Sequence, residues 1–249
     1  EGDLKKYFNI PTDWFGDCSG FNFKTYEEPH FHFGKIPYWE NQNLNGYFQS
    51  YKYLEPFEDQ IKKWFTPKGY ESKANEMTAV HVRRGDYLSL HNCYEILTRE
   101  NYYDKAMELL PAGPYLIFSD DINWCKKVFT GDQFIFSEGK SHIDDFISMM
   151  SCTNFIIANS SYSYWAAYLS NNPSKRVVAP SKWFGPKLAV THNTKDLYYI
   201  VIYATLYYLG GSILSNNMAE NTIALEKKSS LNINDKKNKY FFDFVRKLL

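Results

Sequence analysis

The sequence predicts an α/β protein whose largest part is wound around a parallel β-sheet. Two observations lead to this prediction. Short apolar runs rich in β-branched or aromatic residues alternate with segments of helical spacing between residues 78 and 179, which is typical of strands joined by crossover helices. Polar clusters follow three of the predicted strands, at the edge of the sheet where open α/β folds bind their ligands.

Each element follows from its local pattern. Thr78–Val82 is apolar and β-branched, and this composition predicts a strand. Tyr102, Ala106 and Leu109 recur at helical spacing and predict a helix that Pro111 ends. In order, the predicted strands are 78–82, 115–118, 133–136, 154–158 and 176–179, and the predicted helices are 99–110, 119–129, 142–152 and 160–169.

Three segments of different character divide the chain. Residues 76–196 carry the alternation and predict a Rossmann-like domain. Residues 1–75 lack it, and we expect a smaller N-terminal lobe that is incomplete or loosely wound. Residues 197–249 form a C-terminal extension. Because the stretch 197–214 carries no charge, a buried helix or strand pair is the favoured interpretation and a membrane span is the alternative.

Composition excludes some classes of function. The 28 basic residues balance the 28 acidic ones, so nothing favours a nucleic-acid partner. The aromatic share of 18% is expected mostly in the core, while Tyr-rich surfaces can also line sugar sites. The four cysteines have no CxxC spacing and are expected to be free thiols in a reducing compartment; they are Cys18, Cys93, Cys125 and Cys152.

The segment His81–Asp86 is the first candidate site. Two arginines and a glycine follow the strand 78–82. A guanidinium keeps its charge at neutral pH and can bind two phosphate oxygens at once. Since the position is also where parallel sheets bind ligands, the pattern predicts a diphosphate site. The alternative is a surface turn with two solvated arginines.

Five segments in order resemble α-1,2-fucosyltransferases of glycosyltransferase family 11. His81–Tyr87 resembles the family's HxRRGD signature. The other four resemble its GYFQSxKYF, FSDDxxWC, ANSSFSWW and P..WF segments; they are Asn45–Tyr53, Phe118–Cys125, Asp145–Trp165 and Val178–Pro186. The resemblance covers roughly residues 40–197 and implies a two-lobe GT-B-like fold.

The resemblance also implies an activity. It implies inverting transfer of L-fucose from GDP-fucose to the 2-hydroxyl of a galactose-terminated glycan, without a metal. Two alternatives stay open, namely another acceptor or linkage, and a degenerate domain that binds without turnover. The family's glycine-rich opening turn is absent between Glu1 and Trp39, which adds to the expectation of an incomplete acceptor-side lobe.

The resemblance assigns most roles at the donor site. Arg83 is expected to contact the diphosphate, where a fixed guanidinium stabilises the charge that builds on the leaving GDP. Arg84 is expected to bind the nucleotide or to shape the site. His81 projects to the same side as Arg83 by strand alternation, and it contacts the nucleotide or is a core histidine.

Further polar residues complete the expected donor site. A carboxylate at Asp145, or at Asp144, suits the two donors of the guanine edge, and the alternative is a solvated helix face. Ser160 and Ser161 lie where a helix is predicted to begin. Free N–H groups at such a position can bind an anion, and the alternative is an ordinary N-cap without a ligand. The remaining candidates for nucleotide binding follow two strands; they are Ser119, Asp120, Asp121, Asn159, Ser160 and Ser161.

The catalytic base is the most open assignment. Inverting transfer needs a group that takes the acceptor proton. Asp86, His91 and Glu95 all lie in the loop after the signature. Asp86 is slightly favoured, and pairing with an arginine is an equal alternative for it. No Asp-x-Asp motif or His/Cys cluster suggests a metal.

The N-terminal residues predict a location. Glu1–Lys6 has no apolar run of signal-peptide type. We therefore expect the protein in the cytoplasm or at the cytoplasmic face of a membrane, or in the Golgi lumen if the chain is a fragment of a eukaryotic protein. Membrane association is possible in this interpretation but not required.

Overall fold

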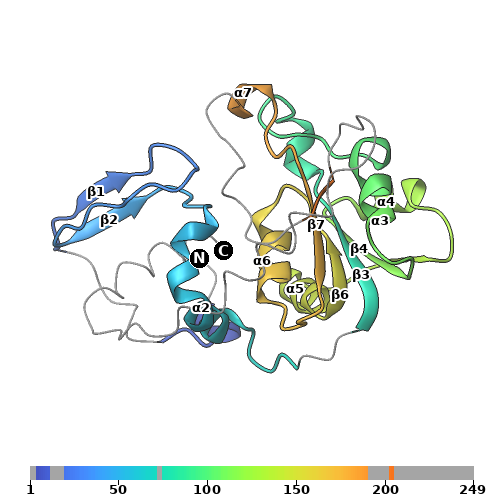
Figure 1. Ribbon diagram of the computed structural model, residues 1–249, viewed down its shortest axis with the longest axis horizontal. Helices are drawn as coiled ribbons and strands as arrows, with labels where there is room; N and C mark the ends of the chain where they lie inside the picture. Colours follow the sequence, from blue (N-terminus) through green and yellow to red (C-terminus); the bar gives the residue numbers. More distant parts are fainter. Residues whose placement is uncertain (1–3, 12–19, 72–74, 190–201, 205–249) are drawn as a thin grey trace, which may run out of the picture.

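A six-stranded parallel sheet forms the centre of the computed structural model, which describes residues 4–11, 20–71, 75–189 and 202–204 (Figure 1). Its strands are β3 (Asn75–Val82), β4 (Tyr115–Ser119), β5 (Phe134–Phe136), β6 (Cys152–Ile156), β7 (Arg176–Pro180) and β8 (Ile202–Ala204). Their spatial order is β5-β4-β3-β6-β7-β8, and each neighbouring pair is parallel.

This order is that of a Rossmann-like fold. The chain winds outward from β3 through β4 to β5, and then returns to β6 on the other side of β3. The direction of winding therefore reverses between β3 and β6. In open α/β sheets the crevice outside the carboxyl ends of such a strand pair is where ligands bind.

Helices cover both faces of the sheet (Figure 1). Alternate residues of β3 point to opposite faces, so Ala79 joins one core cluster and Val80 the other. Helices α5 (His142–Met150) and α6 (Ser161–Leu169) pack on the Ala79 face. The Val80 face is covered by a π-helical turn, Arg99–Tyr103, and by α3 (Asp104–Glu108) and α4 (Ile122–Val128).

All the predicted strands and helices from residue 78 to 180 are present, with shifted ends. The predicted strand 154–158 runs over Cys152–Ile156, because α5 ends at Met150 and Asn75 donates its N–H to Ser151 O. The predicted helix 99–110 was wrong in detail, since it begins as a π-turn. There Thr98 O accepts hydrogen bonds from both Tyr102 N and Tyr103 N.

The two leucines at the end of this predicted helix differ in burial. Leu109, the residue after the end of α3 at Glu108, is 43% exposed. Leu110 takes the buried place at this end of the helix.

The N-terminal part has little regular structure within the described residues 4–11 and 20–71. Its strands β1 (Lys24–Glu27) and β2 (Gln42–Asn45) pair in parallel as a separate two-stranded sheet. The helices are α1 (Leu4–Tyr7) and α2 (Glu58–Phe65), with 3-10 turns over Tyr51–Tyr53 and Glu55–Phe57.

Aromatic contacts join this N-terminal part to the sheet domain. The rings of Phe65 and Trp165 lie 6.4 Å apart, and those of Phe8 and Phe146 lie 6.5 Å apart. Tyr70 OH also donates to Met150 O at 3.1 Å. One continuous apolar core therefore includes residues on both sides of position 75.

Much of the predicted C-terminal extension lies outside the described residues. Within 197–214, the structure places only 202–204, as strand β8 beside β7. None of the helices in the described part is both long and apolar enough to cross a bilayer. Cys93, Cys125 and Cys152 are free thiols, and burial raises the pKa of Cys125 to about 11; Cys18 lies outside the described residues.

Candidate nucleotide-sugar site

The predicted site residues meet at the carboxyl edge of the sheet. Arg83 follows β3, Asp120 follows β4, and Asn159 follows β6 by three residues. Tyr87 OH donates to Asn159 O at 2.9 Å, which joins the turn after β3 to the segment after β6. The cluster therefore lies at the reversal between β3 and β6, where this fold binds ligands.

Arg83 is bound on two sides by carboxylates. Its Nη2 lies 2.5 Å from Asp86 Oδ1, and its Nη1 lies 2.8 Å from Asp120 Oδ2. The guanidinium also lies 5.3 Å from the ring centre of Tyr87. Its side chain keeps 34% of its surface exposed, so a ligand can reach it while these partners fix its direction.

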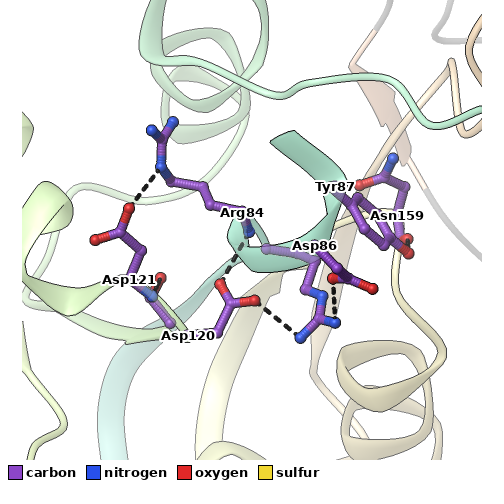
Figure 2. A network of polar contacts seen from close by, with 8 residues as sticks. Arg84, Asp86, Tyr87, Asp120, Asp121 and Asn159 are labelled. Carbon is purple, nitrogen blue, oxygen red and sulfur yellow. Dashed lines mark hydrogen bonds and ion pairs between the residues drawn. The ribbon is translucent and has the colours of Figure 1, made fainter. Parts of the chain in front are cut away.

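Arg84 is held more tightly and farther from solvent. Its side chain is 13% exposed, its Nε donates to Asp121 Oδ2 at 3.1 Å, and its guanidinium stacks 3.7 Å from the ring centre of Trp124. Its backbone N–H donates to Asp120 Oδ1 at 2.9 Å (Figure 2). Asp120 thus connects the backbone at Arg84 to the guanidinium of Arg83.

Gly85 makes this arrangement possible. It begins a 3-10 turn, Gly85–Leu88, directly after the two arginines. A Cβ placed on Gly85 would lie 2.5 Å from Asp120 Oδ2. Any other residue would push Asp120 away from Arg83, so the glycine of the motif serves close packing.

Asn159 is fully buried and positions two loops. Its Nδ2 donates to Glu95 O at 2.9 Å and to Trp183 O at 2.8 Å. Its Oδ1 is buried without a partner. The predicted nucleotide-binding role for this side chain remains a prediction, since the amide is engaged with the backbone of the loops around the site.

The three predicted serines differ in their contacts. Ser119 Oγ accepts a hydrogen bond from Asp121 N at 2.9 Å, so it shapes the turn into α4. Ser160 is the N-cap residue of α6 but its side chain makes no capping bond. Ser161 is the first residue of that helix. The start of α6 therefore offers backbone N–H groups and hydroxyls on the edge near Asn159.

His81 is buried in the Ala79 face, beside α6. Its side chain is 7% exposed and its ring centre lies 5.5 Å from that of Tyr162. Burial, and secondarily the charge of Arg83, lowers the pKa of His81 to about 3. The imidazole is therefore neutral at physiological pH, and its Nδ1 is buried without a partner.

The predicted guanine-binding carboxylates lie in the first turn of α5. Asp145 Oδ1 accepts a hydrogen bond from Ser137 Oγ at 2.6 Å, whereas Asp144 is exposed and bonded to Ser141 Oγ. The charge of Asp145 contributes, after burial, to raising the pKa of Tyr162. Asp145 is thus near the His81–Tyr162 pair, and its role stays a prediction.

The three candidate bases have different surroundings. Asp86 is 54% exposed and forms an ion pair with Arg83. Pairing with an arginine was the alternative to a catalytic role for this residue. His91 is exposed and Glu95 is partly buried. Among the described residues, no group of three or more His, Cys, Asp and Glu side chains is placed to hold a metal ion.

Two contributors had no assigned role from the sequence, although both stand inside the quoted motifs. Tyr87 packs beside Arg83 and anchors the turn to Asn159. Trp124 supports the guanidinium of Arg84. Both contacts could have been predicted from the sequence. Tyr87 stands four positions after Arg83, and Trp124 stands three positions after Asp121, the carboxylate partner of Arg84. Arginine side chains commonly stack on aromatic rings.

The family comparison covers this whole site. The model of Glycosyl transferase family 11 matches residues 9–199, more than half of the chain. The chain belongs to glycosyltransferase family 11. The resemblance drawn from the five sequence segments is therefore confirmed, and the arginine cluster lies in the matched region of a family 11 member.

Two curated relatives are Escherichia coli proteins named as glycosyltransferases. An α-1,2-colitosyltransferase of Escherichia coli is 33% identical over 56% of this chain and 55% of its own length. The O-antigen biosynthesis glycosyltransferase WbnK of Escherichia coli is 33% identical over 43% of this chain and 39% of its own.

A more distant relative is galactoside 2-α-L-fucosyltransferase Sec1 of Mus musculus, which is 31% identical over 40% of this chain and 30% of its own length. The chain spans about half the length, or less, of these curated relatives. No solved structure matches this chain.

Proposed function

We propose that this family 11 glycosyltransferase transfers L-fucose from GDP-fucose to the 2-hydroxyl of a terminal galactose, with inversion at the sugar carbon. The observation that carries the proposal is Arg83, which stands at the carboxyl end of β3 beside the strand reversal and is held by Asp86 and Asp120. The names of the relatives, which include galactoside 2-α-L-fucosyltransferases, supply the sugar and the linkage.

The proposed chemistry is a single displacement. The acceptor oxygen forms a bond to C1 of fucose while the bond from C1 to the β-phosphate oxygen breaks. The electron pair of the broken bond stays on GDP, where Arg83 stabilises the added charge. The proton of the acceptor hydroxyl passes to a base, for which Asp86 is the first candidate and His91 and Glu95 are the others.

The donor site in this proposal uses the sheet edge. His81, Arg84, Ser119, Asp120 and Asp121 surround Arg83 or shape its turn. The start of α6 lies on the other side of the strand reversal, with Ser160 and Ser161 available for a phosphate. Asp145 is proposed for the guanine, and a two-lobe GT-B arrangement would place the acceptor on the N-terminal side.

One other donor has a specific observation in its favour. The α-1,2-colitosyltransferase shares 33% identity over a longer stretch of this chain than the fucosyltransferases do. Colitose is the 3-deoxy analogue of fucose. A site for it would lack a hydrogen-bonding group for the 3-hydroxyl, and it would discriminate weakly against fucose.

Calorimetry with GDP, GMP and GDP-fucose tests the donor site. We expect GDP and GDP-fucose to bind and GMP to bind more weakly, since Arg83 is assigned to the diphosphate. No binding at millimolar GDP would contradict the proposal. Product analysis with lactose as acceptor, and with GDP-fucose and GDP-colitose as competing donors, then identifies linkage and sugar. Binding with neither transfer nor donor hydrolysis would support a non-catalytic domain.

Arg83→Ala tests the central residue. We expect transfer to fall about 100-fold or more, the cost typical of removing one group that stabilises transition-state charge. Arg176→Ala is the matched control, because Arg176 is exposed at the opposite, amino end of β7. Equal losses in the two variants, or full activity of Arg83→Ala, would remove Arg83 from the mechanism.

A further inference from the structure

A row of aromatic rings leads from Arg83 to the N-terminal part of the chain. Tyr87, beside Arg83, stacks on Tyr94 with ring centres 4.2 Å apart and planes at 8°. Tyr94 lies 6.4 Å from Phe184, which lies 5.4 Å from Phe31. The row, which we call the aromatic row, ends at Tyr47, 5.3 Å from Phe31.

The sheet-domain half of the aromatic row is fixed by backbone contacts. Tyr94 and Phe184 form an isolated antiparallel bridge. Gly185 follows Phe184, and a Cβ there would lie 2.7 Å from His91 O and 2.8 Å from Asn92 O. The loop after Asp86 and the loop after β7 therefore pack too closely for a side chain, so their two rings keep one relative position.

The exposed end of the aromatic row is fixed by a carboxylate. Tyr47 follows β2, and Glu28 follows β1. Glu28 Oε2 accepts hydrogen bonds from Tyr47 N at 2.7 Å and from Phe48 N at 2.8 Å. A Cβ on Gly46 would lie 2.3 Å from Glu28 Cβ, so the glycine lets Glu28 reach this turn.

The exposure of the rings changes along the aromatic row. Phe184 is 6% exposed, whereas Tyr47 is 59% exposed. Burial raises the pKa of Tyr94, and the charges of Tyr47, Cys93 and Asp86 contribute further. The phenol of Tyr94 is therefore neutral at physiological pH.

We propose that the aromatic row is the subsite for the acceptor sugar, with the ring of Tyr47 stacking on the apolar face of a galactopyranoside. Galactose presents C–H bonds at C3, C4 and C5 on one face. These polarised C–H bonds suit the negative face of an aromatic ring. The proposal deepens the proposed function and rests on it for the identity of the acceptor.

The position of the row explains why it faces an acceptor rather than the donor. Its first ring, Tyr87, stands next to Asp86, whereas Asp121 lies with Arg84 (Figure 2). A glycan bound along the row would therefore extend from Tyr47 toward the side of Arg83 on which the first candidate base lies. Packing alone explains the buried ring of Phe184, but it does not explain the exposed ring of Tyr47, whose backbone is held by the partly buried carboxylate of Glu28.

Saturation-transfer NMR with methyl β-galactoside tests the subsite directly and needs no donor. We expect saturation of aromatic protons to reach the sugar in the wild type, to be lost in Tyr47→Ala, and to be retained in Tyr47→Phe. Tyr38→Ala is the matched control, because Tyr38 is 66% exposed but precedes β2, at the other end of that strand. We expect it to behave as the wild type.

Kinetics supply a second readout. Tyr47→Ala should raise the acceptor KM about 10-fold, as the loss of one aromatic contact suggests, and leave the KM of the donor and the affinity for GDP unchanged. An unchanged galactoside signal in Tyr47→Ala, or no signal in the wild type, would overturn the subsite. Failure to bind GDP beside a normal galactoside signal would instead contradict the proposed donor and leave the subsite standing.

Discussion

The two sides of the candidate site are positioned in different ways. At the edge of the six-stranded sheet, Arg83, Asp120 and Asn159 stand where parallel strands end. On the N-terminal side, Tyr47 follows a four-residue strand in a two-stranded sheet. Strand pairing places the first group, whereas single side-chain bonds from Glu28 place the second. The comparison indicates that the proposed donor side is built into the fold, whereas the proposed acceptor side depends on a few contacts.

Asn159→Ala should cause the largest loss of stability. It removes a donor from the partly buried carbonyl of Glu95 and one from that of Trp183, which keeps a weaker bond from Glu95 N at 3.3 Å. We expect the free energy of unfolding in urea to fall by about 3 kcal/mol, since an unsatisfied buried polar group costs about 1–3 kcal/mol. The control is Asn171→Ala at an exposed site after α6. A loss below about 1 kcal/mol would mean that strand pairing alone holds these loops.

Glu28→Ala should have a smaller effect on stability. Its two N–H partners lie in a turn where Phe48 has a φ of 47°, an uncommon conformation that Glu28 supports. We expect a loss of about 2 kcal/mol in the same assay, because water can reach part of this turn. Glu27→Ala, at the neighbouring exposed position, is the control. Equal effects of the two variants would show that the turn needs no carboxylate.

The pH dependence of stability tests whether the buried imidazole of His81 stays neutral in the folded protein. The folded pKa, about 3, lies below the ordinary value of 6.5. Below pH 6.5 the unfolded chain therefore binds a proton that the folded chain does not, and stability falls as pH falls. From pH 7.0 to 5.5 the wild type should lose about 1 kcal/mol more than His81→Gln.

Urea unfolding at the two pH values measures this difference. His142→Gln is the matched control, because His142 is exposed at the start of α5. The control should lose stability in parallel with the wild type. An equal loss in His81→Gln would show that His81 does not stay neutral in the folded protein.

The ion pair on α2 should contribute least. Lys62 Nζ lies 2.8 Å from Glu58 Oε1, one turn away, and both side chains are about one third exposed. Glu58→Gln should change the free energy of unfolding by less than about 0.5 kcal/mol, since exposed pairs contribute little. A loss comparable with that of Glu28→Ala would show that the N-terminal part relies on surface charge.

The sequence predicted the sheet domain well for a physical reason. Buried parallel strands require continuous apolar runs, so 78–82 and 115–118 were recognisable from composition alone. The position of Arg83 followed from the end of its strand. The start of β6 and the π-turn at Arg99 could not be predicted in the same way, because they depend on which carbonyl accepts each backbone N–H.

Contacts between distant loops were not predictable. Nothing local indicates that Asn159 bonds to Glu95 O and Trp183 O, or that Gly185 packs on Asn92. The glycine of the His81–Asp86 motif begins a turn, and only the structure shows that it also makes room for the carboxylate of Asp120. Such roles arise only when segments far apart in the chain are packed together.

The central place of β3 has a consequence for how the protein is made. Ala79 pairs with Leu116 on one side and with Phe155 on the other, so both neighbours of this strand are synthesised after it. Pairings between segments so distant in the chain form slowly during folding. The arginine motif is thus synthesised before its distant partners Asp120 and Asn159, and the site is completed only when the later strands pair with β3.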